Sequence, residues 1–219
     1  MDIFTTENFL NDEDINLTNN LEEKEEPFFD TEGVYKGKIT STQQWINPLG
    51  NFAKYIQNKL NAIEHLKNNT IDGIQILRAK KPYDVHSDWI VQKNQVPIAD
   101  PKTNPPLCTV VIPLTPGDYN TIVFDQGATY NNFSEYKKHN TILENYCPDN
   151  EWQKYCSHCH KEDQKYLTIK KVFHWQKGTL FAFDRKLFHC SSNFGTGEKF
   201  DTLNFGTSSK KAIIIWLSQ

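Results

Sequence analysis

The chain has 219 residues, of which 37% are hydrophobic and 13% aromatic, and this predicts one domain with a single sizeable core. No apolar run reaches the roughly 18 residues of a membrane span, and the start, MDIFTTENFL, does not resemble a signal peptide, so we expect a cytoplasmic protein without a membrane partner. Five irregularly spaced cysteines argue against a disulfide framework, and the net charge of -3 with only diffuse basic residues argues against nucleic-acid binding.

Residues 1–30 form an acidic N-terminal arm, with ten acidic residues and one lysine. The remaining chain, 31–219, carries 23 basic and 17 acidic residues. Such charge density is typical of a solvated or flexible segment. The alternative is an arm that folds over a mildly basic body and its anionic partner.

The first predicted element is an amphipathic helix in NPLGNFAKYIQNKLNAIEHLKNNTIDG. Apolar residues recur there at spacings of three and four, as one buried helix face requires; they are Leu49, Phe52, Ile56, Leu60, Ile63 and Leu66. Pro48 suits the first turn, and the polar stretch KNNTIDG predicts the end of the helix.

From Ile71 onward, short apolar runs alternate with turn residues and predict strands. The runs are IQILRA, LCTVVIPLT, NTIVFDQ, YLTIKKVFHW, GTLFAF and KKAIIIWLS. We therefore expect a mainly β (α+β) fold, a jelly roll with the N-terminal helix packed outside. An aromatic-rich polar insert at about 127–165 is expected to act as a lid; the alternative is that it covers a sheet edge.

The motif HSD, at residues 86–88, is the strongest candidate for a metal site. In an extended chain, residues i and i+2 point to the same side, so His86 and Asp88 can direct an imidazole and a carboxylate at one point. Alone, the motif is weak evidence, because ordinary polar residues at a strand end give the same triplet by chance. His189, which enters a strand about a hundred residues later, supplies a second imidazole. Two histidines and one carboxylate leave three open metal positions and are typical of non-haem Fe(II) oxygenases.

The stretch SSKKAIIIWLS offers a basic group for a keto acid co-substrate. Lys210 and Lys211 enter this predicted strand on opposite faces, so one of them is expected to point inward. An inward lysine can hold the distal carboxylate of 2-oxoglutarate by charge-assisted hydrogen bonding. The alternative is that both are solvent lysines of a terminal strand.

The order HSD, then GTLFAFDRKLFH, then a basic residue leading into IIIW, resembles the Fe(II)- and 2-oxoglutarate-dependent dioxygenases of the double-stranded β-helix fold. The resemblance covers about residues 74–217 and lies in motifs. It implies that the iron ligands are His86, Asp88 and His189. It also implies a lysine where an arginine is more usual in the family.

In prolyl hydroxylase-like members the base precedes a strand tryptophan by six residues, so Trp216 favours Lys210 over Lys211. Two departures stand out. The 21 residues from His189 to Lys210 imply an insertion, GTGEKFDTLNFGT, and Ala212 replaces a serine of the family pattern. The carboxylate of Asp88 favours hydroxylation, because halogenating relatives have a small residue at that position.

A second metal site is suggested by YCSHCHKED within the insert. Cys156 and Cys159 form a Cys-x-x-Cys pair, and together with Cys147 they can hold a structural zinc ion. The alternative is a locally packed, reduced loop.

Together these features predict an oxygenase that hydroxylates a C–H bond of a small-molecule or peptide substrate. Dioxygen is consumed, 2-oxoglutarate is the co-substrate, and succinate and carbon dioxide are released. One alternative is a non-catalytic, cupin-like jelly roll that binds a metal or ligand. Another is a cupin-type dioxygenase that uses no keto acid, but such sites draw on more histidines.

Overall fold

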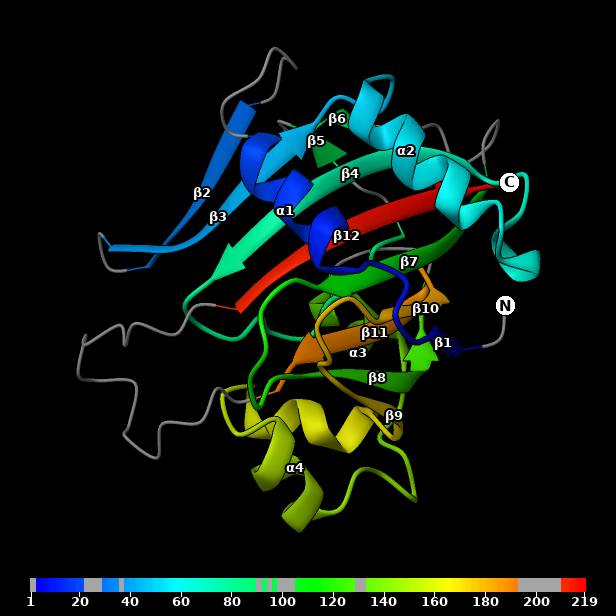
Figure 1. The fold of residues 1–219 in the computed structure, drawn as a ribbon. Coiled ribbons are helices and arrows are strands. Elements are labelled where there is room, and N and C mark those ends of the chain that lie inside the picture. The colour runs from blue at the N-terminus through cyan, green and yellow to red at the C-terminus, as the bar shows by residue number, and fades with distance from the viewer. Residues whose placement is uncertain are drawn as a thin grey trace.

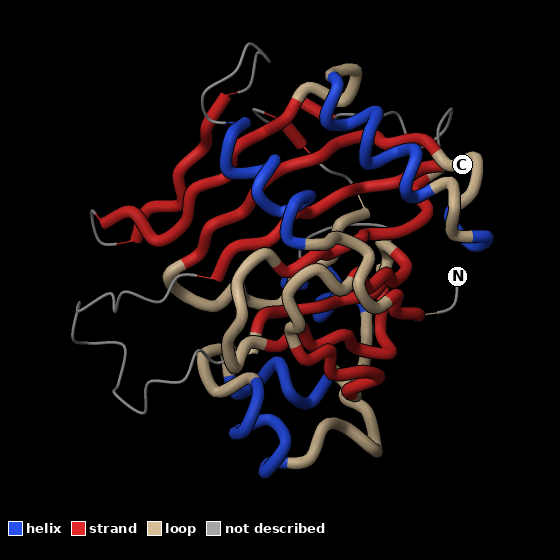
Figure 2. Tube along the Cα trace, viewed as in Figure 1, coloured by secondary structure: helices blue, strands red, loops and turns tan. Residues whose placement is uncertain are grey.

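The computed structural model describes the chain in the following residue ranges: 3–21, 29–35, 38–89, 92–93, 96–97, 105–128, 133–192 and 210–219. This part consists mainly of antiparallel strands in two larger sheets, with helices on the outside (Figure 1 and Figure 2). The predicted mainly β fold is therefore confirmed. The predicted insertion at 195–207 lies outside the described residues. No described helix has the length and apolar character needed to span a bilayer.

The larger sheet has seven strands, and all neighbouring strands are antiparallel. Their order is β1 (Phe4–Thr6), β10 (Leu180–Asp184), β7 (Pro106–Pro113), β12 (Lys210–Ser218), β4 (Thr70–Ala79), β3 (Lys38–Ile46) and β2 (Phe29–Tyr35). The chain's last strand, β12, therefore lies at the centre of the sheet, between β7 and β4.

The smaller sheet has three strands, in the order β11 (Leu187–Ser191), β8 (Asn120–Gly127) and β9 (Ile169–His174). The backbone of His86 pairs with β11: its N–H donates to the His189 carbonyl at 3.0 Å, and the His189 N–H donates back at 2.8 Å. A separate short hairpin joins β5 (Gln92–Lys93) to β6 (Val96–Pro97).

Side chains alternate between the two faces of each strand. On β12, Ala212, Ile214 and Trp216 pack in a core shared with the smaller sheet. The intervening side chains pack in a second core on the outer face of the larger sheet; they are Ile213, Ile215 and Leu217. The central strand is therefore buried on both faces, which explains its continuous apolar run.

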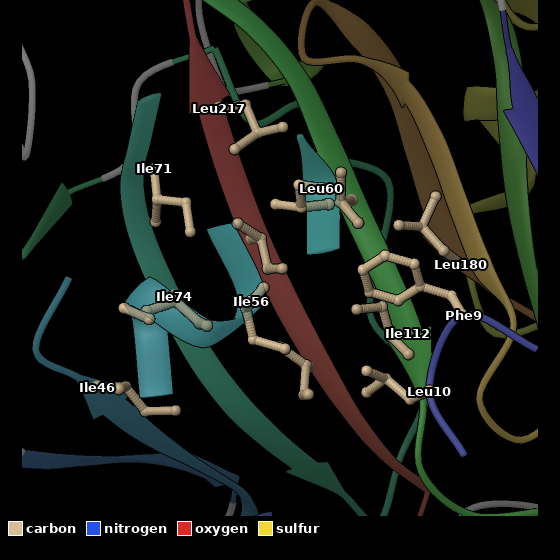
Figure 3. Packing of buried hydrophobic residues seen from close by; sticks show 14 of the residues in the cluster. Phe9, Leu10, Ile46, Ile56, Leu60, Ile71, Ile74, Ile112, Leu180 and Leu217 are labelled. Atoms are coloured by element: carbon tan, nitrogen blue, oxygen red, sulfur yellow. The ribbon is translucent and has the colours of Figure 1, made fainter. Parts of the chain in front are cut away.

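The outer face of the larger sheet is covered by α1 (Asp12–Asn20) and α2 (Asn51–Leu60) (Figure 1). Figure 3 shows Ile56 and Leu60 of α2 close to apolar side chains of the sheet, such as Ile74 and Ile112. Each fully buried Ile or Leu side chain contributes about 1.5–3 kcal/mol through the hydrophobic effect. The prediction that the helix packs outside the sheet is confirmed.

The helix is shorter than its apolar pattern predicts. It begins after the N-cap Gly50, so Leu49 lies outside it and is 77% exposed. It ends at Leu60, and a turn leads to the 3-10 helix η2 (Glu64–Leu66), which buries Leu66. The turn places the last apolar residue of the pattern on the same core without a continuous helix.

The described part of the acidic arm is folded. β1 pairs with β10, and α1 begins with a capping box between Asn11 and Asp14. Asp14 also accepts a hydrogen bond from Lys59 at 2.8 Å. Apolar arm residues enter the core beneath the helices; they are Phe9, Leu10 and Ile15. The interpretation as a flexible arm is wrong for residues 3–21, because these apolar side chains are buried despite the surrounding acids.

The insert packs on the outer side of the smaller sheet (Figure 1). It contains α3 (Phe133–His139), α4 (Asp149–Tyr155) and the 3-10 helix η3 (Lys161–Tyr166). The Phe133 ring meets Phe188 of β11 at 4.8 Å between centroids, and Trp152 lies 6.4 Å from Phe124 of β8. Aromatic residues of the insert, such as Phe133 and Trp152, therefore pack in a separate core behind the smaller sheet.

Candidate metal centre

The three predicted metal ligands meet at one point between the two sheets. His189 Nε2 lies 3.4 Å from Asp88 Oδ2, and His86 Nε2 lies 4.0 Å from Asp88 Oδ1. One ligand atom from each residue falls within 4.8 Å of the others. The side chains are partly to largely buried, with exposed fractions of 37% for His86, 14% for Asp88 and 9% for His189. We call these three residues the triad.

Backbone hydrogen bonds fix which nitrogen each histidine presents. His86 Nδ1 lies 2.7 Å from the carbonyl of Asp84, and His189 Nδ1 lies 3.1 Å from that of Leu187. A carbonyl oxygen only accepts, so in the neutral ring Nδ1 carries the proton and Nε2 keeps its lone pair. Both Nε2 lone pairs are therefore available to one ion, as is usual for metal-bound histidine.

The protonation states also suit a metal. Burial and the neighbouring His86 lower the pKa of His189 well below its ordinary value, so the ring is neutral at neutral pH. Burial by itself would raise the pKa of Asp88, but the two histidines and a hydrogen bond from Thr109 outweigh it and hold this pKa below its usual value. Two neutral imidazoles and an ionised carboxylate can hold one divalent ion, and this donor set fits Fe(II).

Asp88 is held from two sides by other strands. The Thr109 hydroxyl on β7 donates to Asp88 Oδ2 at 2.8 Å. Arg185, in the turn between β10 and β11, binds the Asp88 backbone: its Nε donates to the Asp88 carbonyl at 2.9 Å, and its own carbonyl accepts from the Asp88 N–H at 3.0 Å. The carboxylate and its peptide are therefore both positioned before any ion binds.

Arg185 is itself anchored by a buried ion pair. Its Nη1 lies 2.7 Å from Asp72 Oδ2 on β4, and the two side chains are 3% and 2% exposed. The Ser218 hydroxyl at the end of β12 also donates to Asp72. This network links the triad segment to the centre of the larger sheet.

The structure separates the two candidate lysines. Lys210 follows the inward alternation of β12, is 3% exposed and lines the same cavity as the triad. Its ammonium group donates to the Ser191 hydroxyl and lies 4.8 Å from the centre of the Trp175 ring. Burial lowers the pKa of Lys210 to about 7. Lys211 pairs in register with Arg78 of β4 and does not line this cavity.

The cavity has a volume of about 330 Å³, near the lower end for small-molecule sites. Its triad end carries the two histidines and Asp88, and its walls are mostly apolar or aromatic side chains of the larger sheet; they are Trp45, Leu77, Val111, Ile214 and Trp216. None of the described residues between 133 and 165 lines the cavity. The packing of these residues therefore does not support the expected role of the insert as a lid.

Two polar atoms of this wall lack hydrogen-bond partners among the described residues. They are the side-chain carbonyl oxygen of Gln75 and the indole nitrogen of Trp216, on residues that are each 5% exposed. Buried polar atoms are rarely left without a partner unless water or a ligand supplies it. The Gln75 oxygen is therefore available to a bound polar molecule, whereas the Trp216 indole faces the Asp88 carboxylate and helps to lower its pKa.

Four residues that surround the triad are not evident from the sequence. Thr109, Arg185, Ser191 and Trp175 stand in runs that look like ordinary strands and turns. Arg185 had one detectable signal, a charge directly between two apolar strands, but its partner Asp72 lies 113 residues away in the chain.

The predicted zinc ligands Cys147, Cys156 and Cys159 do not come together as a set. Among the described residues, the group that forms instead consists of His158, Cys159 and Cys190, within 4.8 Å of one another. The Cys147 thiol is 3.7 Å from the carbonyl of Pro148. The predicted zinc site at these three cysteines is therefore not supported.

No family model and no curated protein matches the sequence. The structure nevertheless resembles solved structures over 99% of the chain. The non-heme alpha ketoglutarate dependent epimerase SnoN, from nogalamycin biosynthesis, matches with a TM-score of 0.53 and 8% identity over 78% of its own chain. The non-heme alpha ketoglutarate dependent carbocyclase SnoK, also from nogalamycin biosynthesis, matches with a TM-score of 0.54 and 10% identity over 79% of its own chain.

HygX from Streptomyces hygroscopicus, solved with nickel and 2-oxoglutarate bound, matches at a TM-score of 0.50 and 11% identity over 82% of its chain. SnoN has also been solved with Fe3+, alpha ketoglutarate and nogalamycin RO. At such low identities the likeness shows the fold. The predicted double-stranded β-helix is confirmed.

Proposed function

We propose that this chain is an Fe(II)- and 2-oxoglutarate-dependent oxygenase that hydroxylates a C–H bond of a small-molecule or peptide substrate. The observation that carries the proposal is the triad, whose two histidine nitrogens and one carboxylate converge in the cavity that the buried Lys210 also lines. The shared fold with structures that hold 2-oxoglutarate supports it. Bound iron and 2-oxoglutarate supply the oxidising power, by coupling use of dioxygen to release of succinate and carbon dioxide.

Metal binding and co-substrate binding are assigned to different residues of the cavity. The triad would hold iron through the Nε2 atoms of His86 and His189 and the Asp88 carboxylate, where these side chains line the cavity. Lys210 and the Ser191 hydroxyl hold the distal carboxylate of 2-oxoglutarate by charge-assisted hydrogen bonds. Lys210 and Ser191 together form an end of the cavity that is rich in hydrogen-bond donors. The positive charge of the lysine is complementary to the negative charge of the ligand carboxylate.

The substrate binds against the cavity wall that the larger sheet forms. This apolar wall excludes water from the reacting bond, and the unsatisfied side-chain oxygen of Gln75 orients a polar group of the substrate. Asp88 in the triad favours hydroxylation, which would add one oxygen atom to the product mass. Epimerisation or ring closure, the reactions named for SnoN and SnoK, would leave no added oxygen and would redefine the reaction class.

The proposal is tested by anaerobic titration of the metal-free protein with Fe(II) and then 2-oxoglutarate. The visible charge-transfer band of the iron chelate is expected in the parent and absent in His189→Ala. His174→Ala is the matched control, because His174 is an exposed histidine at the end of β9. It is expected to retain the band.

Two results would count against the proposal. Metal binding without the band would show that 2-oxoglutarate does not bind the metal. It would favour a non-catalytic, cupin-like metal-binding protein. An unchanged band in His189→Ala would place the iron elsewhere.

A further inference from the structure

Three thiols and one imidazole meet behind the triad, where the insert packs on β11. Cys156 and Cys159 come from the insert, and Cys190 follows His189 on β11 with its side chain in the core of the insert. The three thiols are 0%, 8% and 1% exposed, and none is in a disulfide. Buried cysteines are common as small apolar residues, but convergence of three with a histidine is a typical donor set for zinc.

Two of the separations are close to those of a tetrahedral zinc site. Zinc–sulfur bonds of about 2.3 Å set tetrahedral sulfurs about 3.8 Å apart, and a sulfur and a nitrogen about 3.6 Å apart. The Cys156 and Cys190 sulfurs are 3.8 Å apart. The Cys159 sulfur lies 3.3 Å from His158 Nε2, and His158, Cys159 and Cys190 are mutually within 4.8 Å.

We propose that Cys156, His158, Cys159 and Cys190 bind a structural zinc ion. Cys156 lies outside the group of three whose donor atoms are mutually within 4.8 Å, but its sulfur contacts that of Cys190, and a small shift would bring it in as the fourth ligand of a Cys3His set. This site is separate from the triad and independent of the proposed oxygenase function, because a closed tetrahedron leaves no position for a substrate.

Zinc binding would change the protonation and hydrogen bonds of this cluster. Zinc binds thiolates, so loading releases the thiol protons to solvent. His158 Nε2 also lies 3.1 Å from the carbonyl of Tyr83. Zinc binding exchanges this hydrogen bond for a metal–nitrogen bond.

The zinc would fasten three segments at the base of the candidate metal centre. It would join the insert to β11 next to His189, close to the Tyr83 segment that leads into His86. Without the ion, the insert is held by apolar contacts with the smaller sheet and by hydrogen bonds such as that between His158 and the Tyr83 carbonyl. The site therefore explains why a polar loop with closely spaced cysteines and histidines is built into this fold.

The test is the zinc content of the purified full-length chain after dialysis, measured by elemental mass spectrometry. The parent is expected to retain one equivalent, and Asp88→Ala, in which the triad is disrupted, is expected to retain the same. Cys159→Ser and Cys190→Ser are expected to lose it. Cys147→Ser is the matched control, a buried cysteine of the same cluster outside the proposed ligand set.

Cobalt(II) substitution of the parent gives a second measurement that needs no variant. Intense visible d–d bands and a thiolate-to-cobalt charge-transfer band are expected for a tetrahedral thiolate site. Zinc lost in Asp88→Ala but kept in Cys159→Ser would overturn the proposal. A cobalt spectrum without thiolate charge transfer would overturn it as well, whatever the fate of the iron titration.

Discussion

Replacement of Lys210 by alanine is expected to raise the Kd for 2-oxoglutarate roughly 100-fold, equivalent to about 2.8 kcal/mol. Lys210 is 3% exposed, so a carboxylate bound to it gains attraction with little screening. Loss of the ammonium group leaves the ligand carboxylate beside the Ser191 hydroxyl, without this cation, in a mostly apolar cavity. The measurement is anaerobic titration of the Fe(II)-loaded protein with 2-oxoglutarate, followed by the visible band.

Lys211→Ala is the matched control for this prediction. It removes the same side chain one residue later on β12, where the lysine points away from the cavity. Its Kd is expected to stay within about twofold of the parent, a margin of about 0.4 kcal/mol. Equal losses in the two variants, or a normal Kd in Lys210→Ala, would contradict the assignment of the anchor to Lys210.

The same lysine gives 2-oxoglutarate binding a pH dependence. In the ligand-free protein the pKa of Lys210 is lowered to about 7 by burial, so the group loses its proton as pH rises above this value. A bound carboxylate favours the protonated form, so binding above pH 7 requires proton uptake. The Kd is therefore expected to be flat below about pH 7 and to rise up to about tenfold per pH unit above it.

Lys210→Arg separates this titration from other pH effects. A guanidinium group stays charged throughout this range, so the variant's Kd is expected to be independent of pH between about 7 and 9, even if its absolute value is weaker. A rise with pH as steep as that of the parent would assign the titration to another group.

Arg185→Met is expected to destabilise the fold by about 3–5 kcal/mol, because it leaves the buried carboxylate of Asp72 without its charged partner. The measurement is the free energy of unfolding from denaturant titration. The variant also removes the Nε hydrogen bond to the Asp88 carbonyl, so weaker Fe(II) binding is expected in the fraction that folds.

Two controls accompany this variant. Lys170→Met breaks an exposed ion pair with Asp125 and is expected to cost less than about 1 kcal/mol. A double variant, Arg185→Met with Asp72→Leu, removes both buried charges and is expected to recover much of the lost stability. Similar losses in Arg185→Met and Lys170→Met would show that the Arg185 pair contributes no more than a surface contact.

The sequence predicted the strands after residue 71 because their apolar pattern is local. The run KKAIIIWLS coincides with β12, Lys210–Ser218. The same reasoning missed β2 and β3, which precede the helix and are rich in polar residues. These strands extend the sheet beyond β4, and β3 supplies Trp45 to the cavity wall. β3 pairs with β4, which follows the helix, and β2 pairs with β3, so the place of both strands depends on a contact that no short window of sequence contains.

The same distinction holds for the site. The spacing of His86 and Asp88 is a local signal, and His189 stands at a recognisable place after a strand and a turn. Lys210 is separated from Lys211 only by strand alternation, which a register error of one residue would reverse. The supports from Thr109 and Arg185 depend on strands and a turn far away in the chain, so they emerge only from the folded arrangement.

The backbone pairing of His86 with His189 affects how the protein would bind and release a metal ion. Two main-chain hydrogen bonds, of 3.0 and 2.8 Å, set the spacing of these two histidines as part of the fold. The entropy of bringing them together is therefore lost during folding and need not be lost again when iron arrives. The protein can then be stripped and reloaded reversibly, and its apo and iron-bound crystals should superimpose closely around the triad.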